Sequence, residues 1–206
     1  MTTDTNTPRM KRSDAVGLWI WLALGAGLII GTIVQAVIRV GEVLGGGEVR
    51  VFAQFAGTMA DAPIGPDGAP VSVELETAYL IAPELPVASI WALVIEQIIV
   101  VLTVAAVVSC LLLLMRSVLR GQVFSRRNTL LVSIASIAGF AGVVLAPFFG
   151  NMGANGAFAW ISDRTFNNDI LSADVTLIFG LAFIASIAVT TFTVGDRLQR
   201  ETEGLV

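Results

Sequence analysis

The chain has 206 residues, of which 55% are hydrophobic and 14% are charged, and its formal net charge is −4. Soluble domains carry about 25% charged residues, so these charges are too few to cover a soluble surface, and the composition predicts an integral membrane protein. The chain has no histidine, which removes the commonest general base and metal ligand. Its one cysteine, Cys110, excludes an intrachain disulfide.

Four apolar segments are predicted to cross the membrane, because each comes close to the ~20 helical residues that span ~30 Å of hydrocarbon. We expect these spans at residues 16–40, 88–115, 130–149 and 175–193. The second is longer than a perpendicular span requires, so it should tilt or project beyond the membrane. The other segments are an N-terminal tail (1–15), a first outer connection (41–87), a basic loop (116–129), a second outer connection (150–174) and a C-terminal tail (194–206).

The first outer connection carries a hairpin pattern. Val71, Val73 and Leu75 alternate with polar residues, which is the period of a half-buried strand. The Pro-Asp-Gly of residues 66–68 predicts a turn between two strands. Because a lone hairpin is marginally stable in water, we expect it to lean on the helix ends or on another subunit.

Small residues four positions apart recur in the spans, as in Gly27 and Gly31 of the first and Ala138 and Gly142 of the third. This spacing lets membrane helices approach closely. The predicted fold class is therefore an all-α membrane protein, a four-transmembrane-helix bundle with a small extracytoplasmic β-hairpin-like insertion between helices 1 and 2.

Glu96 and Gln97 are the sharpest polar feature of the spans. A charge in the middle of the membrane costs about 2.5–3.5 kcal/mol on the insertion scale, so Glu96 should have a partner. Gln35 and Arg39, four positions apart near the outer end of the first span, are the natural candidates. These four residues form a candidate intramembrane polar site; the alternative is a structural Glu96–Arg39 pair that ties two helices together.

Basic residues predict the orientation of the chain. They gather before the first span, between the second and third, and after the fourth, at Arg9, Lys11, Arg12, Arg116, Arg120, Arg126, Arg127, Arg197 and Arg200. Short cytoplasmic segments retain lysine and arginine, so we expect a multi-pass protein of the cytoplasmic membrane with both termini in the cytoplasm. The loop arginines Arg116, Arg120, Arg126 and Arg127 are either candidate contacts for anionic lipid or a protein partner, or a topology signal alone.

The basic loop also contains local folding signals. Gly121 can end the preceding helix in a left-handed conformation, Ser125 or Asn128 can cap the next helix, and Phe124 can staple its first turn. Residues 120–128, Arg-Gly-Gln-Val-Phe-Ser-Arg-Arg-Asn, resemble the G-x-x-F-[ST]-x-x-N signature of a bacterial membrane family, DUF 2975, a domain of unknown function. The resemblance implies four spans, a larger connection between the first two, and residence in a bacterial inner membrane.

The second outer connection is rich in asparagine and glycine. Irregular backbone at this depth suits a cavity lining, so Asn151, Asn155 and Asp163 are candidates to line an outer vestibule with Glu96. A short interfacial helix around Trp160 is also expected.

The predicted function is an accessory, regulatory or signalling role exercised through protein partners. The alternative is a small-solute or ion pathway that uses Glu96, formed by an oligomer. We expect no enzyme and no cofactor, because the chain has no serine elbow, phosphate loop or carboxylate–histidine metal set. The expected partners are the lipid bilayer and a protein partner or second copy. Some members of the resembling family are encoded beside small helix-turn-helix regulators, which implies a link to such a regulator but no direct nucleic-acid binding by this chain.

Overall fold

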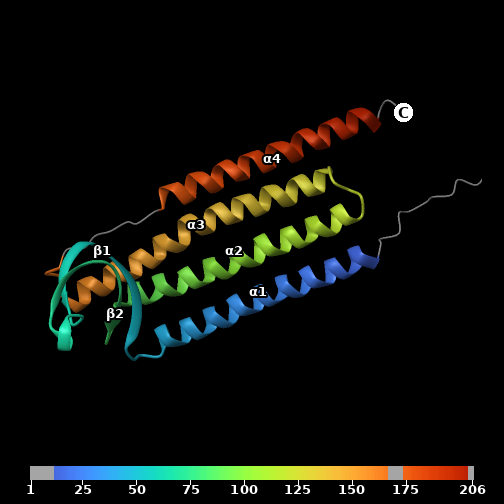
Figure 1. The fold of residues 1–206 in the computed structure, drawn as a ribbon. Coiled ribbons are helices and arrows are strands. Elements are labelled where there is room, and N and C mark those ends of the chain that lie inside the picture. Colours follow the sequence, from blue (N-terminus) through green and yellow to red (C-terminus); the bar gives the residue numbers. More distant parts are fainter. Residues whose placement is uncertain (1–11, 167–173, 204–206) are drawn as a thin grey trace, which may run out of the picture. The chain divides into compact units, whose positions relative to one another are not determined.

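The structure is a computed structural model that describes residues 12–166 and 174–203. Its elements in chain order are α1 (Arg12–Leu44), β1 (Val49–Ala62), a 3-10 turn (Pro66–Gly68), β2 (Val71–Ala82), α2 (Val87–Leu119), α3 (Arg126–Ile161) and α4 (Val175–Glu203) (Figure 1). Arg9 and Lys11 of the predicted basic cluster, and residues 167–173 of the second connection, lie outside the described residues.

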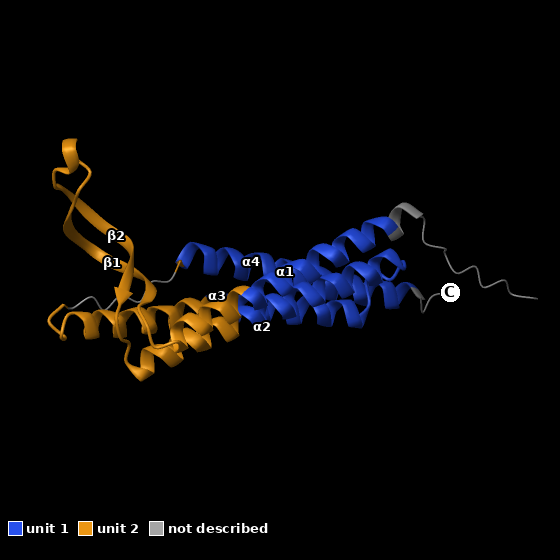
Figure 2. Cartoon of the chain, turned by 90° about the horizontal axis from the view of Figure 1, so that it is seen from below, with its two compact units in different colours: residues 1–34, 100–143, 175–206 blue, residues 35–99, 144–174 orange. Residues whose placement is uncertain are grey.

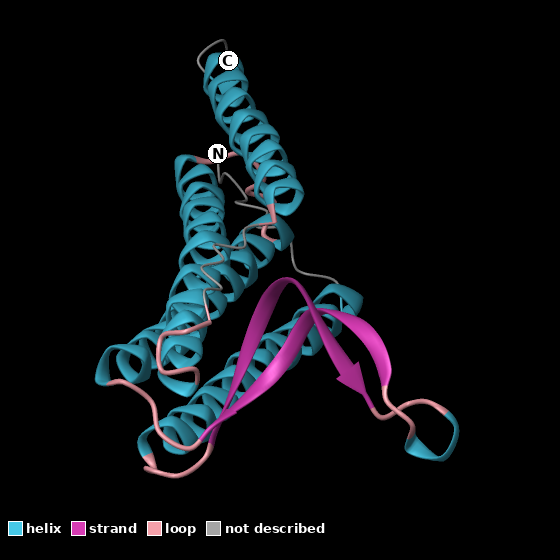
Figure 3. Ribbon diagram, turned by 90° about the vertical axis from the view of Figure 1, so that its left-hand side faces the viewer, coloured by secondary structure: helices cyan, strands magenta, loops and turns pink. Residues whose placement is uncertain are grey.

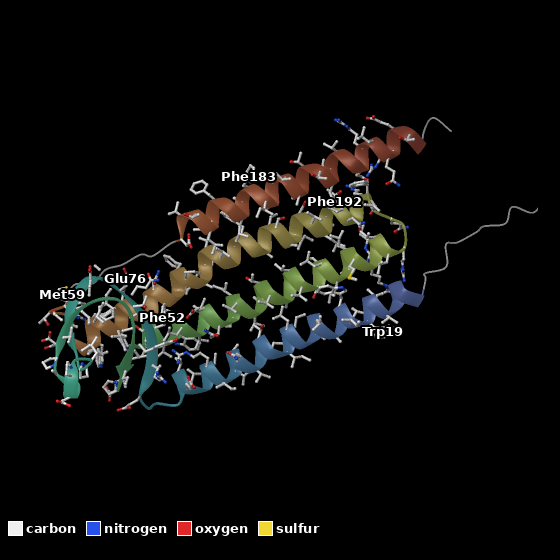
Figure 4. The ribbon with its side chains drawn as sticks, viewed as in Figure 1. Trp19, Phe52, Met59, Glu76, Phe183 and Phe192 are labelled. Carbon is white, nitrogen blue, oxygen red and sulfur yellow. The ribbon has the colours of Figure 1, made fainter. Side chains whose placement is uncertain are left out.

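Four helices are long and apolar enough to cross a membrane: Val16–Leu44, Val87–Leu119, Arg126–Ile161 and Val175–Thr202. Their apolar side chains are widely exposed, and Trp19, Phe179 and Phe183 each leave about 70% of their surface uncovered. Figure 4 shows Phe183 projecting away from α4. Lipid, rather than water, suits such a surface. The chain is therefore a multi-pass membrane protein, and the predicted fold class is confirmed.

The chain divides into two compact units, which Figure 2 colours separately. Unit 1 comprises residues 1–34, 100–143 and 175–206 and contains a segment of each of the four helices. Unit 2 comprises residues 35–99 and 144–174 and contains the hairpin with the adjoining parts of α1, α2 and α3.

Small residues bring the helices of unit 1 close together. A Cβ atom added at Gly142 would overlap the Thr103 side chain of α2, and one added at Gly25 would lie 2.7 Å from Leu112 Cδ1. A Cβ atom at Gly27 or Gly31 would meet nothing within 4 Å. The spacing of small residues therefore located a close approach on α3, whereas on α1 the contact falls at Gly25, because spacing does not say which face of a helix meets its neighbour.

The β-hairpin of unit 2 confirms the predicted insertion. Its strands pair antiparallel from Val49↔Ala82 to Gln54↔Thr77, and again from Thr58↔Leu75 to Ala62↔Val71. The register shifts between Gln54 and Thr58, where Gly57 adopts a φ of +69°. We call the part from Val49 to Gln54 with its partner residues the basal half, and the part beyond the shift the distal half.

The basal half of the hairpin is anchored in the hydrophobic core of unit 2. Val49, Val51 and Ala53 alternate inward and are at most 3% exposed. They join a cluster contributed by the end of α1 and by α2 and α3, which consists of Val43, Leu93, Val94, Ala154, Ala157 and Phe158. Figure 3 shows the strands curving away from the helices of this unit beyond their base. The expectation that the hairpin leans on helix ends is met by this core.

Helix α3 continues to Ile161, so the prediction that an irregular connection begins at residue 150 is wrong. Glycines led to that prediction because they weaken helices. Here they allow close packing on α2: an added Cβ would lie 3.1 Å from Glu96 Oε1 at Gly150 and 2.6 Å from Leu93 Cδ2 at Gly153, and at Gly156 it would overlap Ser89. The helix also runs through Pro147 and includes the segment around Trp160 that was expected to form a separate short helix.

Candidate functional site: a polar pocket beneath the hairpin

A cavity of about 490 Å³ opens within unit 2, between the basal half of the hairpin and the adjoining helices. It is lined by Arg39, Glu42, Arg50, Phe52, Tyr79, Leu93, Glu96, Gln97 and Gly150. We call it the basal pocket. Four of these residues carry a formal charge, in a region where the flanking helices are largely apolar.

Strand alternation positions the hairpin residues of the pocket. Val49 and Val51 turn into the core, so Arg50 and Phe52 occupy the opposite face of β1. Phe52 is paired in register with Tyr79, and their rings meet edge to face with centroids 5.5 Å apart. The guanidinium carbon of Arg50 lies 5.3 Å from the centre of the Tyr79 ring, which is within the range of a cation–π contact. Figure 4 places Phe52 at the base of the hairpin.

Arg39 ties the end of α1 to the start of β1. Its Nη1 lies 3.0 Å from Glu42 Oε2, and its Nη2 donates a hydrogen bond to the carbonyl oxygen of Arg50. The Arg39 side chain is 25% exposed and that of Glu42 is 57% exposed. This guanidinium is therefore already engaged on two sides.

Glu96 lies on α2 with its carboxylate against the backbone of Gly150. It is half-buried, and it forms no ion pair within 4.0 Å with any residue that the structure describes. Arg39 attracts it electrostatically over a longer distance. The predicted direct Glu96–Arg39 pair is thus not formed, because Arg39 pairs instead with Glu42, one turn further along its own helix.

Only one of the other predicted site residues lines the basal pocket. Gln97 lines the basal pocket with Glu96 and Arg39, whereas Gln35 is exposed and does not line it. Asn151 and Asn155 are half-buried on α3 and Asp163 is exposed just after that helix, and none of the three lines the pocket.

Sequence reasoning missed six residues of the basal pocket: Glu42, Arg50, Phe52, Tyr79, Leu93 and Gly150. The alternation of β1 carried a signal, since it places Arg50 and Phe52 on one face. Their meeting with Glu96 depends on how the hairpin folds back over α2, which is a non-local contact that no spacing reveals.

The second predicted site is the α2–α3 connection, in unit 1. Its arginines Arg116, Arg120, Arg126 and Arg127 are all exposed, and none has an ion-pair partner within 4.0 Å in the described part of the chain. Their side chains are thus open to lipid headgroups or to a partner.

The signature residues of this connection build its backbone. Gly121 has a φ of +82°, as predicted for the end of α2, and the Asn128 amide donates to Ser125 Oγ at 3.3 Å, as predicted for a capped α3. The Asn128 side chain is fully buried and donates to the carbonyl oxygens of Gln122 and Val123, at 2.5 and 2.9 Å. The ring of Phe124 packs on Phe192 of α4, with centroids 5.7 Å apart, a contact between elements that the sequence did not indicate.

The side chains at these sites offer charges, hydrogen-bonding groups and aromatic faces. Within residues 12–166 and 174–203, no group of three or more His, Cys, Asp or Glu side chains is arranged to hold a metal ion. Cys110 is buried in α2 and is not among the residues that line the basal pocket. What the pocket offers is two guanidinium groups, two carboxylates, an amide and two aromatic rings.

We found no match to this chain among protein-family models, curated proteins or solved structures.

Proposed function

We propose that this protein is an accessory or regulatory component of a membrane assembly, and that it recognises a protein partner through the hairpin. The observation that carries the proposal is a long two-stranded ribbon fixed at one end: β1 has 14 residues and β2 has 12, and the core of unit 2 includes residues of the basal half and Phe55 of the register shift, but none from Thr58 to Leu75.

The distal half has the surface of a recognition element. Met59 is 64% exposed and Ile64 is 69% exposed, beside exposed acidic residues such as Glu76. In the described residues the sheet consists of β1 and β2 alone, so each strand has one edge open to an additional strand. An extended segment of a partner that adds to such an edge gains main-chain hydrogen bonds and pockets for alternate side chains, and covering the edge also prevents unspecific pairing.

The arginine distribution supports an orientation for this proposal. With the α2–α3 connection and both termini in the cytoplasm, the hairpin faces the opposite side, where it would meet an extracytoplasmic partner segment. The exposed arginines Arg116, Arg120, Arg126 and Arg127 would then face anionic headgroups or a cytoplasmic partner, for which the family resemblance suggests a small helix-turn-helix regulator.

The test uses the full chain purified in mild detergent from its native membrane. We expect a stoichiometric partner to co-elute with the native chain and to be lost from the variants Met59→Arg and Ile64→Arg. The matched control Glu76→Gln changes a neighbouring exposed strand residue without adding charge to the apolar surface, and it should keep the partner. Equal retention by all three variants, each with native helix content, would refute recognition through the distal half.

A second candidate, a small-solute or ion pathway, is favoured by one observation: the carboxylate of Glu96 borders the basal pocket. Intramembrane carboxylates commonly mark such pathways. In reconstituted vesicles, this function predicts a flux of small cations that Glu96→Gln abolishes while the melting temperature stays near that of the native chain.

A further inference from the structure

The charges of the basal pocket do not cancel in pairs. It contains two guanidinium groups, on Arg39 and Arg50, and two carboxylates, on Glu42 and Glu96. Arg39 and Glu42 form an ion pair, with 3.0 Å between Nη1 and Oε2. Arg50 and Glu96 remain, and neither belongs to an ion pair within 4.0 Å among the described residues.

Arg50 contacts a residue of the hairpin and a residue of α1. Its guanidinium rests over the ring of Tyr79, and its carbonyl oxygen accepts the hydrogen bond from Arg39. The Glu96 carboxylate also lines the pocket, where it lies against Gly150 of α3. Glu96 is half-buried, and a half-buried charge without a direct partner is costly. Arg50 is exposed, so its guanidinium is open to a ligand. The pocket therefore offers two charges of opposite sign that a ligand could satisfy.

The size of the cavity suits a small ligand. Its volume of about 490 Å³ falls within the roughly 300–1,000 Å³ that is typical of ligand sites. The formal charges of the lining sum to zero, so a ligand with both charges would leave the site neutral, whereas a simple anion or cation would leave either Glu96 or Arg50 without a partner.

We propose that the basal pocket binds a zwitterionic group in which an ammonium is joined by a short linker to a phosphate or carboxylate. The ammonium lies at Glu96, with the Phe52 ring as a second cation-binding surface. The oxyanion lies at Arg50, whose planar guanidinium matches phosphate and carboxylate geometry. This chemistry is shared by the headgroup of a zwitterionic phospholipid and by a free solute, and both can reach a pocket formed where α1 ends and α2 begins.

The proposal is tested first on the native full chain with three water-soluble probes: glycerophosphoethanolamine, which has both charges, and glycerol phosphate and ethanolamine, which have one each. Isothermal titration in detergent should give a dissociation constant for the double-charged probe at least ten times lower than for either half. Equal or tighter binding of one half, or no binding of any probe, would overturn the zwitterion assignment without any variant being made.

Two variants then separate the two ends of the ligand. Glu96→Gln should weaken glycerophosphoethanolamine at least tenfold while leaving glycerol phosphate binding unchanged, and Arg50→Gln should weaken both probes. Glu84→Gln and Arg164→Gln are matched controls, because both residues are exposed and belong to unit 2 without lining the pocket. Weakening by the controls that equals weakening by the pocket variants would overturn the proposal.

The source of the ligand is distinguished in nanodiscs. Phosphatidylethanolamine that stays bound to the native chain in mass spectra, but not to the two pocket variants, identifies the lipid headgroup. Binding of the soluble probe with no preference for phosphatidylethanolamine over phosphatidylglycerol identifies a free solute. These measurements need no protein partner, so they stand or fall separately from the proposed function.

Discussion

Asn128 shows how one buried amide can organise a loop between two membrane helices. Its Nδ2 group bridges the carbonyl oxygens of Gln122 and Val123, while its backbone amide completes the Ser125 cap. Its Oδ1 atom is buried and has no hydrogen-bond partner among the residues that the structure describes. A buried acceptor without a hydrogen-bond partner costs stability, so the hydrogen bonds that Asn128 donates must contribute enough stability to offset that cost. The result is a loop backbone that holds Arg126 and Arg127 outward at the start of α3.

We therefore predict that Asn128→Ala lowers the free energy of unfolding by about 1–2 kcal/mol, because two carbonyl oxygens lose their donor. Denaturation of the detergent-solubilised chain, followed by circular dichroism, measures the change. Gln122→Ala is the control: that side chain is exposed and only its backbone enters these contacts, so its effect should be within about 0.5 kcal/mol. A loss of equal size in the two variants would contradict this role for the Asn128 side chain.

The residues that could be predicted from the sequence are those whose signal is local. Gly121 and Ser125 behave as expected because a left-handed helix end and a helix cap involve neighbours in the chain. Arg39 and Glu96 were predicted to be close because charges in apolar helices need partners, and they do share a pocket. The partner that Arg39 takes is nevertheless Glu42, which lies one turn away on the same helix, while its second nitrogen donates to the backbone of β1.

In α3, glycine residues support close packing between helices rather than irregular backbone. The segment from Gly150 to Gly156 lacks side chains where α2 comes closest, at Glu96, Leu93 and Ser89. Composition indicated irregular backbone there, and packing between helices overrides that preference. The hairpin was predictable because its period of two and its Pro-Asp-Gly turn are properties of its own sequence.

Filling this contact should separate the two helices. Gly156→Leu would place a side chain where an added Cβ already overlaps Ser89, and overpacking of this kind costs about 1–3 kcal/mol. The expected result is a lower melting temperature in detergent and weaker binding at the basal pocket, whose wall includes the neighbouring Gly150.

The same substitution at Gly180 of α4 is the control, since an added Cβ there would meet nothing within 4 Å. It should leave stability unchanged or slightly improved, because leucine favours helix more than glycine does. If the Gly156→Leu chain is as stable as the Gly180→Leu chain, the stability of the protein does not depend on the close approach of α2 and α3 at Gly156.

For the whole chain, composition was enough to predict a membrane protein, because the number of charges limits how much surface can face water, and the lengths of the apolar segments predicted four spans. The same four helices appear in the structure, each extended at one or both ends beyond its predicted bounds. Spans are easy to predict and their ends are not, since polar residues near a helix end can be satisfied by water, headgroups or tertiary contacts.

The orientation of the whole chain in the membrane can be tested with reporters. If the arginine asymmetry governs insertion, a reporter that is active only in the cytoplasm should be active when fused after Val206 and silent when inserted next to Asp67, in the turn of the hairpin. A reporter inserted after Arg120, with the downstream spans retained, serves as an internal control and should be active. The reverse pattern would place the hairpin in the cytoplasm and remove the extracytoplasmic partner from the proposed function.

The register shift between Gln54 and Thr58 gives the hairpin two halves with different mechanics. In the basal half, Val49, Val51 and Ala53 anchor the paired strands in the core, and Phe55 packs against that core within the shift, whereas no residue from Thr58 to Leu75 belongs to it. The interruption therefore allows the two halves to open separately. Force applied at the turn can separate the strands of the distal half as far as Gly57 while Arg50 and Tyr79 stay in place. Amide hydrogens should accordingly exchange with solvent in two steps along each strand, rapidly beyond the shift and slowly below it.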